Sequence, residues 1–144
     1  VFATGEANFN DVAARLADCK YPSIRVVPYI HEMSDVLAAS DLAVCRAGAL
    51  TISELMVLGI PSLLVPSPNV VANHQEYNAR LLEKADAAVV ILEKHLNGRV
   101  LHEKIVGMLR DEEKLKKMSC NASKLGLRDA NQKVFSIVEA LAGK

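Results

Sequence analysis

The sequence contains no tryptophan, and aromatic residues make up only 4% of its 144 residues. Proteins that bind single-stranded nucleic acid commonly stack bases on aromatic side chains, so this composition argues against that class. The formal net charge is zero, from 17 basic and 17 acidic residues. A neutral chain has no general electrostatic attraction for nucleic acid, and we expect no nucleic-acid partner.

Cysteine is also scarce, because only Cys19, Cys45 and Cys120 are present and they lie far apart. None of them has the spacing of a metal or redox motif, so we expect a reduced cytoplasmic protein without a metal site or cofactor. No apolar run approaches the roughly 18–20 residues of a membrane span. The first residues lack the basic head and apolar core of a signal peptide. They resemble a strand entered from its middle, which predicts a piece of a longer protein.

The sequence does contain a regular alternation of short apolar runs and amphipathic stretches, which predict strands and helices respectively. The predicted strands are 1–4, 24–29, 42–45, 62–65 and 87–92, with a turn at 21–23. The predicted helices are 9–16, 33–39, 51–58, 74–85, 97–109, 111–125 and 130–141. This order predicts an α/β fold, a doubly wound, Rossmann-like parallel sheet with helices on both faces.

Some helix ends and faces are also predicted. Asn10 is a candidate N-cap for the first helix, and Gly59, Gly126 and Gly143 are expected to end helices. The charged stretch 111–117 is expected to face solvent. The last helix is expected to bury one apolar stripe: Val134, Ile137, Val138 and Leu141.

The strongest functional pattern is in residues 41–80, where a strand leads through a turn of small residues into a helix. The first N–H groups of a helix are unpaired and partly positive, which suits a phosphate, and Gly48 permits close approach. Thr51, Ser53 and Glu54 follow, and the Glu54 carboxylate is better suited to sugar hydroxyls. Ordinary helix capping explains the same residues, so the chemistry alone leaves both interpretations open.

In a doubly wound sheet, ligands bind beyond the carboxyl ends of the strands. The loops expected at those ends are Gly5 and residues 29–32, 46–49, 67–75 and 92–94. The Gly48 turn and the motif that contains His74 and Gln75 are therefore expected to converge on one edge of the sheet.

Two runs of sequence together resemble a known family. They are Cys45-Arg46-Ala47-Gly48-Ala49-Leu50-Thr51-Ile52-Ser53-Glu54 and Asn73-His74-Gln75-Glu76-Tyr77-Asn78-Ala79, with Gly59-Ile60-Pro61 and Val65-Pro66 between them. This pattern resembles the MurG family of bacterial glycosyltransferases and covers most of the chain, up to the last helix. The resemblance implies the C-terminal, donor-binding half of a GT-B enzyme. Such enzymes transfer N-acetylglucosamine, with inversion, from UDP-N-acetylglucosamine to the lipid-linked muramyl-pentapeptide of peptidoglycan synthesis.

The resemblance also implies roles for residues of the 41–80 segment. Glu54 accepts both ribose hydroxyls of UDP, which would satisfy a carboxylate that is costly to bury unpaired. Ala49, Leu50 and Thr51 lie against the diphosphate and the N-acetylglucosamine, and Ser53 is assigned to the same site. Gly48 is expected because a Cβ would obstruct the turn or the ligand.

The remaining roles come from loops on either side of that segment. Gln75 hydrogen-bonds sugar hydroxyls, and Asn78 ties its loop to the helix. Tyr29 and Ile30 lie on the uracil, with Met33 lining the same pocket. Arg46 either pairs with an acidic neighbour or faces the diphosphate. His31, His74 and Asn73 are given no certain role.

The family pattern implies parts that this sequence does not contain. They are a Gly-rich turn and an N-terminal domain holding the lipid acceptor, the general base and the membrane contact. We therefore expect 1–144 to be one nucleotide-sugar-binding domain, incomplete at its start, with no assignable catalytic residue and no activity alone. The whole enzyme would act at the inner face of the bacterial cell membrane. Two alternatives are a catalytic subunit of a split GlcNAc-transferase and a non-enzymatic interaction module.

Overall fold

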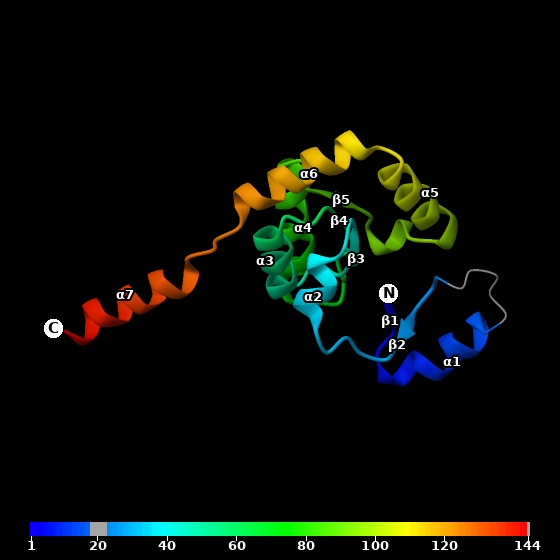
Figure 1. Ribbon diagram of the computed structural model, residues 1–144, viewed down its shortest axis with the longest axis horizontal. Coiled ribbons are helices and arrows are strands. Elements are labelled where there is room, and N and C mark those ends of the chain that lie inside the picture. The colour runs from blue at the N-terminus through cyan, green and yellow to red at the C-terminus, as the bar shows by residue number, and fades with distance from the viewer. Residues whose placement is uncertain (18–22, 144) are drawn as a thin grey trace. The chain divides into compact units, whose positions relative to one another are not determined.

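The computed structural model describes residues 1–17 and 23–143 (Figure 1). Most of the turn predicted at 21–23, and Cys19, lie outside these residues. The chain forms two compact units, Val1–Val36 and Leu37–Lys144. Each unit is described by itself below.

The first unit pairs two short strands in parallel. Strand β1 (Phe2–Ala3) lies beside β2 (Val26–Val27), and helix α1 (Glu6–Leu16) connects them. The prediction that α1 begins near Asn10 is wrong, because its N-cap is Gly5 with φ 76°. The apolar periodicity begins at Phe9, but Glu6 and Ala7 favour helix and extend it toward the N-terminus.

The second unit contains a three-stranded parallel sheet in the order β3 (Ala43–Cys45), β4 (Ser62–Leu64) and β5 (Ala88–Val90). Helix α2 (Met33–Ala38) crosses the boundary between the units. The other helical elements of the second unit are α3 (Ala49–Leu58), η1 (Val71–Asn73), α4 (His74–Lys84), η2 (Glu93–His95), α5 (Gly98–Leu109), α6 (Glu112–Leu125) and α7 (Ala130–Ala142).

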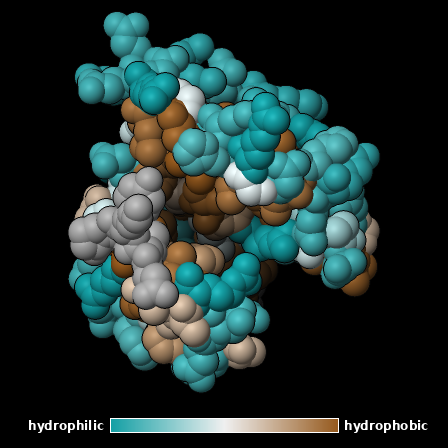
Figure 2. All heavy atoms as spheres, turned by 90° about the vertical axis from the view of Figure 1, so that its right-hand side faces the viewer, coloured by the Kyte–Doolittle hydropathy of each residue, from teal (hydrophilic) through white to brown (hydrophobic). Residues whose placement is uncertain are grey.

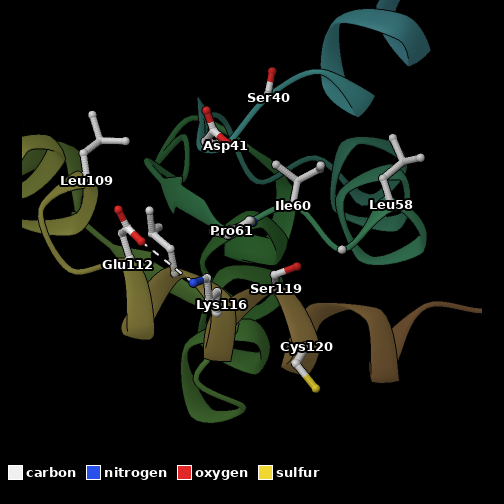
Figure 3. A pocket seen from close by; sticks show the side chains of 12 residues that line it. Ser40, Asp41, Leu58, Ile60, Pro61, Leu109, Glu112, Lys116, Ser119 and Cys120 are labelled. Carbon is white, nitrogen blue, oxygen red and sulfur yellow. Dashed lines mark ion pairs between the residues drawn. The ribbon is translucent and has the colours of Figure 1, made fainter.

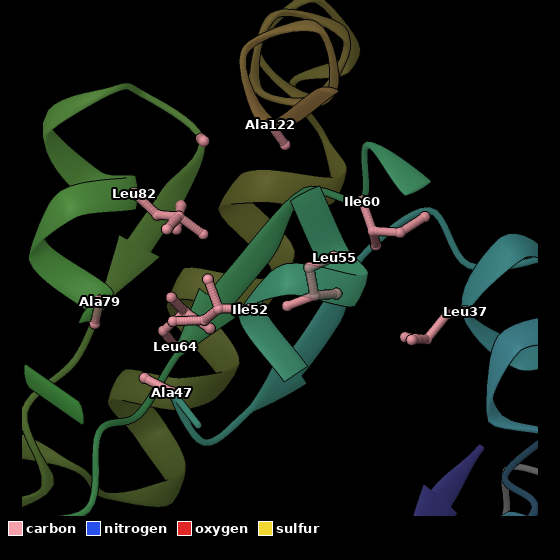
Figure 4. Packing of buried hydrophobic residues seen from close by; sticks show 11 residues of the cluster. Leu37, Ala47, Ile52, Leu55, Ile60, Leu64, Ala79, Leu82 and Ala122 are labelled. Carbon is pink, nitrogen blue, oxygen red and sulfur yellow. The ribbon is translucent and has the colours of Figure 1, made fainter. Parts of the chain in front are cut away.

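Helices cover both faces of this sheet. Leu64 of β4 packs with residues of α3, α4 and α6, such as Leu55, Leu82 and Ala122 (Figure 4). The preceding residue of β4, Leu63, points to the opposite face and packs with Met108 of α5 and Met118 of α6. Successive strand residues face opposite sides, so one buried strand supplies both cores. The predicted α/β class with parallel strands is therefore confirmed.

The strands are shorter than the apolar runs that predicted them. The run at 24–29 yields only Val26–Val27, and the run at 87–92 yields only Ala88–Val90. Pro28 lacks an N–H and cannot continue the ladder. Ala87 and Ile91 are buried without belonging to a strand, because apolar residues beside a short ladder still pack into the core.

The last helix departs from its predicted packing. No residue of α7 is buried, and Val134, Ile137, Val138 and Leu141 are each more than half exposed. The apolar stripe at helical spacing is present, but no described residue covers it. The inward-facing prediction for this helix is therefore wrong.

The charged stretch at the start of α6 does face solvent, as expected. Figure 2 shows hydrophilic side chains over most of the upper surface of the molecule, where α5 and α6 lie. Within the described residues, no helix is both long enough and apolar enough to cross a membrane.

Candidate functional site

The start of α3 has the features of an anion site. Helix α3 begins at Ala49 directly after β3 and the turn through Gly48, and its first backbone bond runs from Ile52 N to Gly48 O at 2.9 Å. The N–H groups of Ala49, Leu50 and Thr51 therefore have no partner among the described residues. They lie at the positive end of the helix dipole, where a phosphate is favoured.

Helix capping does not explain the polar residues that follow. The N-cap is Gly48, which has no side chain, and no side-chain cap is formed. Ser53 Oγ instead donates to Ala49 O at 2.9 Å, one turn back in the same helix. The capping alternative is wrong, because α3 begins two residues before the Thr51 that would have been its cap.

Gly48 itself is not required by the backbone. Its φ is −65°, which any residue adopts, and an added Cβ would meet only Thr51 Oγ1 at 3.7 Å. The expectation that a Cβ would obstruct the turn is therefore wrong. The other expected reason for a glycine at this position, close approach of a ligand to the backbone, stays a prediction.

Glu54 lies one turn into α3 and is exposed. It makes no hydrogen bond or ion pair with any described residue. The argument from the cost of burying an unpaired carboxylate does not apply, because solvent reaches this one. Glu54 is nonetheless an available acceptor on the same helix as three available donors, and the side chain of Leu50, one of these donors, is 82% exposed.

Helix α4 holds two loops at the same edge of the sheet. Gln75 Oε1 accepts from Ser67 N at 2.9 Å, which fixes the loop after β4. Asn78 Nδ2 donates to Ala47 O at 3.4 Å, which joins α4 to the turn before α3. Asn78 has a structural role as predicted, but it joins α4 to the turn before α3 and not to its own loop. The Gly48 turn and the Gln75 motif do converge.

The residues that enter α4 are in an uncommon conformation. Ala72 and Asn73 have φ of 52° and 51°, in the left-handed region. Asn73 Nδ2 donates to Glu76 Oε2 at 2.8 Å, and His74 Nδ1 donates to Val71 O at 2.8 Å. Local hydrogen bonds thus hold a turn whose backbone costs about 1–3 kcal/mol per residue in this region, and such turns concentrate at ligand sites.

Arg46 pairs with an acidic neighbour, which was one of its two predicted roles. Its Nη1 forms an ion pair with Glu93 in η2 and donates to Val65 O at 3.3 Å. Glu93 was not predicted as a site residue. The only signal in the sequence was the expectation that 92–94 lies at the carboxyl edge of the sheet.

The residues assigned to uracil belong to the first unit. Tyr29 and Ile30 lie in the loop after β2, and Tyr29 is 62% exposed. The rings of Tyr29 and His31 meet edge to face, with centroids 5.1 Å apart. Met33 begins α2 and is 40% exposed. Tyr29 and Met33 are therefore accessible to solvent, and Ile30 is half-buried.

The thiols offer no reactive centre near the turn. Burial raises the pKa of Cys45, the last residue of β3, to about 11. The neutral thiol therefore persists at physiological pH and is a poor nucleophile. No cluster of three His, Cys, Asp or Glu side chains among the described residues could hold a metal ion.

A groove of about 490 Å³ opens at the carboxyl edge of β4 and β5. Its walls come from the two segments that follow these strands and from the first turn of α4: Pro66, Pro68, Asn73, Glu76, Leu92, Glu93 and Lys94. A larger groove of about 720 Å³ lies at the opposite edge, where Asp41 and Pro61 precede β3 and β4 (Figure 3). None of the residues predicted to bind substrate lines either groove, so neither groove by itself marks the candidate site.

Comparison with known proteins decides the family. Residues 1–134 match the family model described as glycosyltransferase family 28 C-terminal domain. The chain belongs to this family.

Two similar proteins carry the same name. The chain is 48% identical over 139 residues to a protein of Acetivibrio thermocellus, and 50% identical over 143 residues to one of Ruminiclostridium cellulolyticum. Both are called UDP-N-acetylglucosamine–N-acetylmuramyl-(pentapeptide) pyrophosphoryl-undecaprenol N-acetylglucosamine transferase. These matches cover 96% and 98% of this chain but only 38% and 39% of the relatives.

A solved structure agrees. The crystal structure of Acinetobacter baumannii MurG matches 96% of this chain and 42% of that one, with a TM-score of 0.85 and 29% identity. The resemblance to the MurG family is therefore confirmed. The chain spans about two fifths of the length of the relatives it matches.

Proposed function

We propose that this family 28 C-terminal domain binds the UDP-N-acetylglucosamine donor. The whole enzyme would transfer N-acetylglucosamine to a lipid-linked muramyl-pentapeptide. The observation that carries the proposal is the start of α3, where three unpaired N–H groups lie one turn before an unpaired carboxylate. Diphosphate and ribose diol are the matching groups of a nucleotide sugar, the first an anion and the second a pair of hydroxyl donors.

The proposed roles follow from these donors and acceptors. The N–H groups of Ala49, Leu50 and Thr51 bind diphosphate oxygens, with Ser53 behind them in the helix. Glu54 accepts from both ribose hydroxyls, and Gln75 offers its amide N–H groups to the sugar while its Oε1 holds Ser67. No catalytic base is assigned among the described residues.

The proposal extends to the base and to the setting of the whole enzyme. Tyr29, Ile30 and Met33 would bind uracil, so UDP should bind more tightly than GDP or ADP in the same titration. The acceptor and the membrane would be contacted by another part of the enzyme, at the cytoplasmic face of the bacterial membrane. The names of the relatives support this bacterial enzyme over the split GlcNAc-transferase and the non-enzymatic module.

The test is the Glu54→Gln variant, which keeps the shape of the side chain but removes its charge and one acceptor. Hydrogen bonds to charged groups contribute about 1.5–3 kcal/mol each, so we expect UDP affinity to fall about tenfold or more by calorimetry. Thermal stability should not change, because Glu54 is exposed and unpaired.

Two controls make this result specific. A UDP analogue without the 2′ and 3′ hydroxyls should bind wild type and Glu54→Gln equally. Glu113→Gln, which changes another exposed carboxylate on α6, should leave UDP affinity unchanged. Equal loss of affinity for UDP and for the analogue would contradict the ribose assignment.

A further inference from the structure

Arg46 connects the carboxyl ends of all three strands of the second unit. It directly follows β3, its Nη1 donates to Val65 O directly after β4, and it pairs with Glu93 in η2 after β5. Within the described chain, this pair is the only side-chain hydrogen bond or ion pair recorded between the loop after β5 and the other two loops. The first of these loops, after β3, leads directly into the proposed donor site at the start of α3.

The segment that Arg46 holds is the turn that presents the N–H groups of α3. Ala47 is buried, and its carbonyl accepts from Asn78 of α4. Gly48 has no side chain to cap the helix and no special backbone conformation that would fix its direction. The turn is therefore held by the burial of Ala47 in the core, by Asn78 on one side and by Arg46 on the other.

The charge of Arg46 is already matched. Glu93 neutralises the guanidinium, and Val65 O accepts from the same Nη1. Both side chains are partly exposed, at 53% and 39%, and ion pairs of this kind contribute little to stability. An effect of the pair should therefore show in the geometry of the site and not in the stability of the fold.

We propose that Arg46 and Glu93 are positioning residues that hold the α3 turn in the orientation that receives the diphosphate. This inference rests on the proposed donor site. It differs from the alternative in which Arg46 binds the diphosphate directly, because Glu93 has opposite effects in the two cases. If the Arg46–Glu93 pair is a clamp that holds the α3 turn, loss of Glu93 weakens UDP binding. If Arg46 is itself a phosphate ligand, loss of Glu93 frees its guanidinium and strengthens UDP binding.

The test is whether Glu93→Gln raises or lowers the affinity for UDP. Calorimetry on the 144-residue chain measures this affinity. We expect the affinity to fall three- to tenfold, because the neutral amide no longer holds the guanidinium and the turn loses its fixed direction. Unchanged or higher affinity would overturn the proposal. The Glu103→Gln variant, which breaks the exposed Arg99–Glu103 pair on α5, is the matched control and should have no effect.

Further arms separate positioning from general damage. The affinity for uridine, measured by NMR titration, should not change in Glu93→Gln, because uridine has no diphosphate; a parallel loss for uridine would overturn the proposal. The double variant Arg46→Ala/Glu93→Gln should lose no more UDP affinity than Arg46→Ala alone, and additive losses would count against a clamp. If wild type does not bind UDP, the proposed function fails. If UDP binds and Glu54→Gln weakens it while Glu93→Gln does not, only the clamp fails.

Discussion

Gly59 shows how one residue can be essential through its backbone. It ends α3 in the left-handed conformation, with φ 69° and ψ 37°. A Cβ at this position would lie 2.2 Å from Ser123 Oγ and 3.3 Å from Ser119 O of α6. The sequence predicted the helix end correctly, but the close packing against α6 depends on a residue more than sixty positions away.

We predict that Gly59→Ala lowers the free energy of unfolding by about 2–4 kcal/mol, as the sum of left-handed strain and a clash with α6. Chemical denaturation of the two proteins measures this difference. Adding Ser123→Ala should recover the part due to the hydroxyl and leave about 1–2 kcal/mol, the cost of the left-handed conformation. Equal stability of Gly59→Ala and wild type would show that the turn can rearrange.

Gly126 ends α6 at the predicted position, but the reason for a glycine there differs from the expected one. It follows α6 as expected, but its φ is −71°, so the left-handed explanation for a terminal glycine does not apply. A Cβ there would lie 2.7 Å from Met56 O of α3, so close packing of two backbones requires the glycine.

Individual contacts between residues that are distant in the sequence were equally hard to predict at the candidate site. The convergence of the Gly48 turn with the motif that contains Gln75 could be predicted, because both follow strands of one parallel sheet. The pairing of Arg46 with Glu93 could not, because it is set by how the strands pair and not by any local sequence signal.

At the scale of elements, periodicity located most helices better than strands. The predicted range 111–125 agrees with α6 (Glu112–Leu125) because Asp111 caps it by accepting from Lys114 N at 2.9 Å. Strand ends were overpredicted because hydrophobic burial extends beyond the hydrogen-bonded ladder. For α7 the periodicity was correct, but an apolar stripe cannot show whether another part of the same chain covers it.

We predict that ending the chain at Asp129, which removes α7, changes the free energy of unfolding by less than about 0.5 kcal/mol, since α7 buries no residue. The contrast is Met118→Ala in α6, which is 3% exposed and should cost about 2–5 kcal/mol. Urea denaturation of both variants measures the difference. A truncation as harmful as Met118→Ala would mean that α7 packs against the unit in solution.

At the scale of the whole molecule, the described residues include the groups proposed to bind the donor, and none of them is assigned as the catalytic base. The predicted convergence of two motifs was confirmed inside the second unit, where Asn78 and Ala47 meet. The assignment of Tyr29, Ile30 and Met33 in the first unit to uracil stays a prediction. An enzyme of this kind also needs an acceptor, and the relatives are more than twice as long as this chain.

These two facts lead to a prediction about activity. The 144 residues alone should not transfer N-acetylglucosamine from UDP-N-acetylglucosamine to a lipid-linked muramyl acceptor in a radiolabel assay. The same residues should support transfer when they replace the matching segment of the Acetivibrio thermocellus relative, since the two are 48% identical over 139 residues. Glu54→Gln in that chimera should raise the KM for the donor about tenfold, because the lost hydrogen bonds act on the bound nucleotide and not on the acceptor. Turnover by the isolated chain would place the base among these residues. An inactive chimera that still binds UDP would mean instead that this domain does not match the acceptor half of its relative.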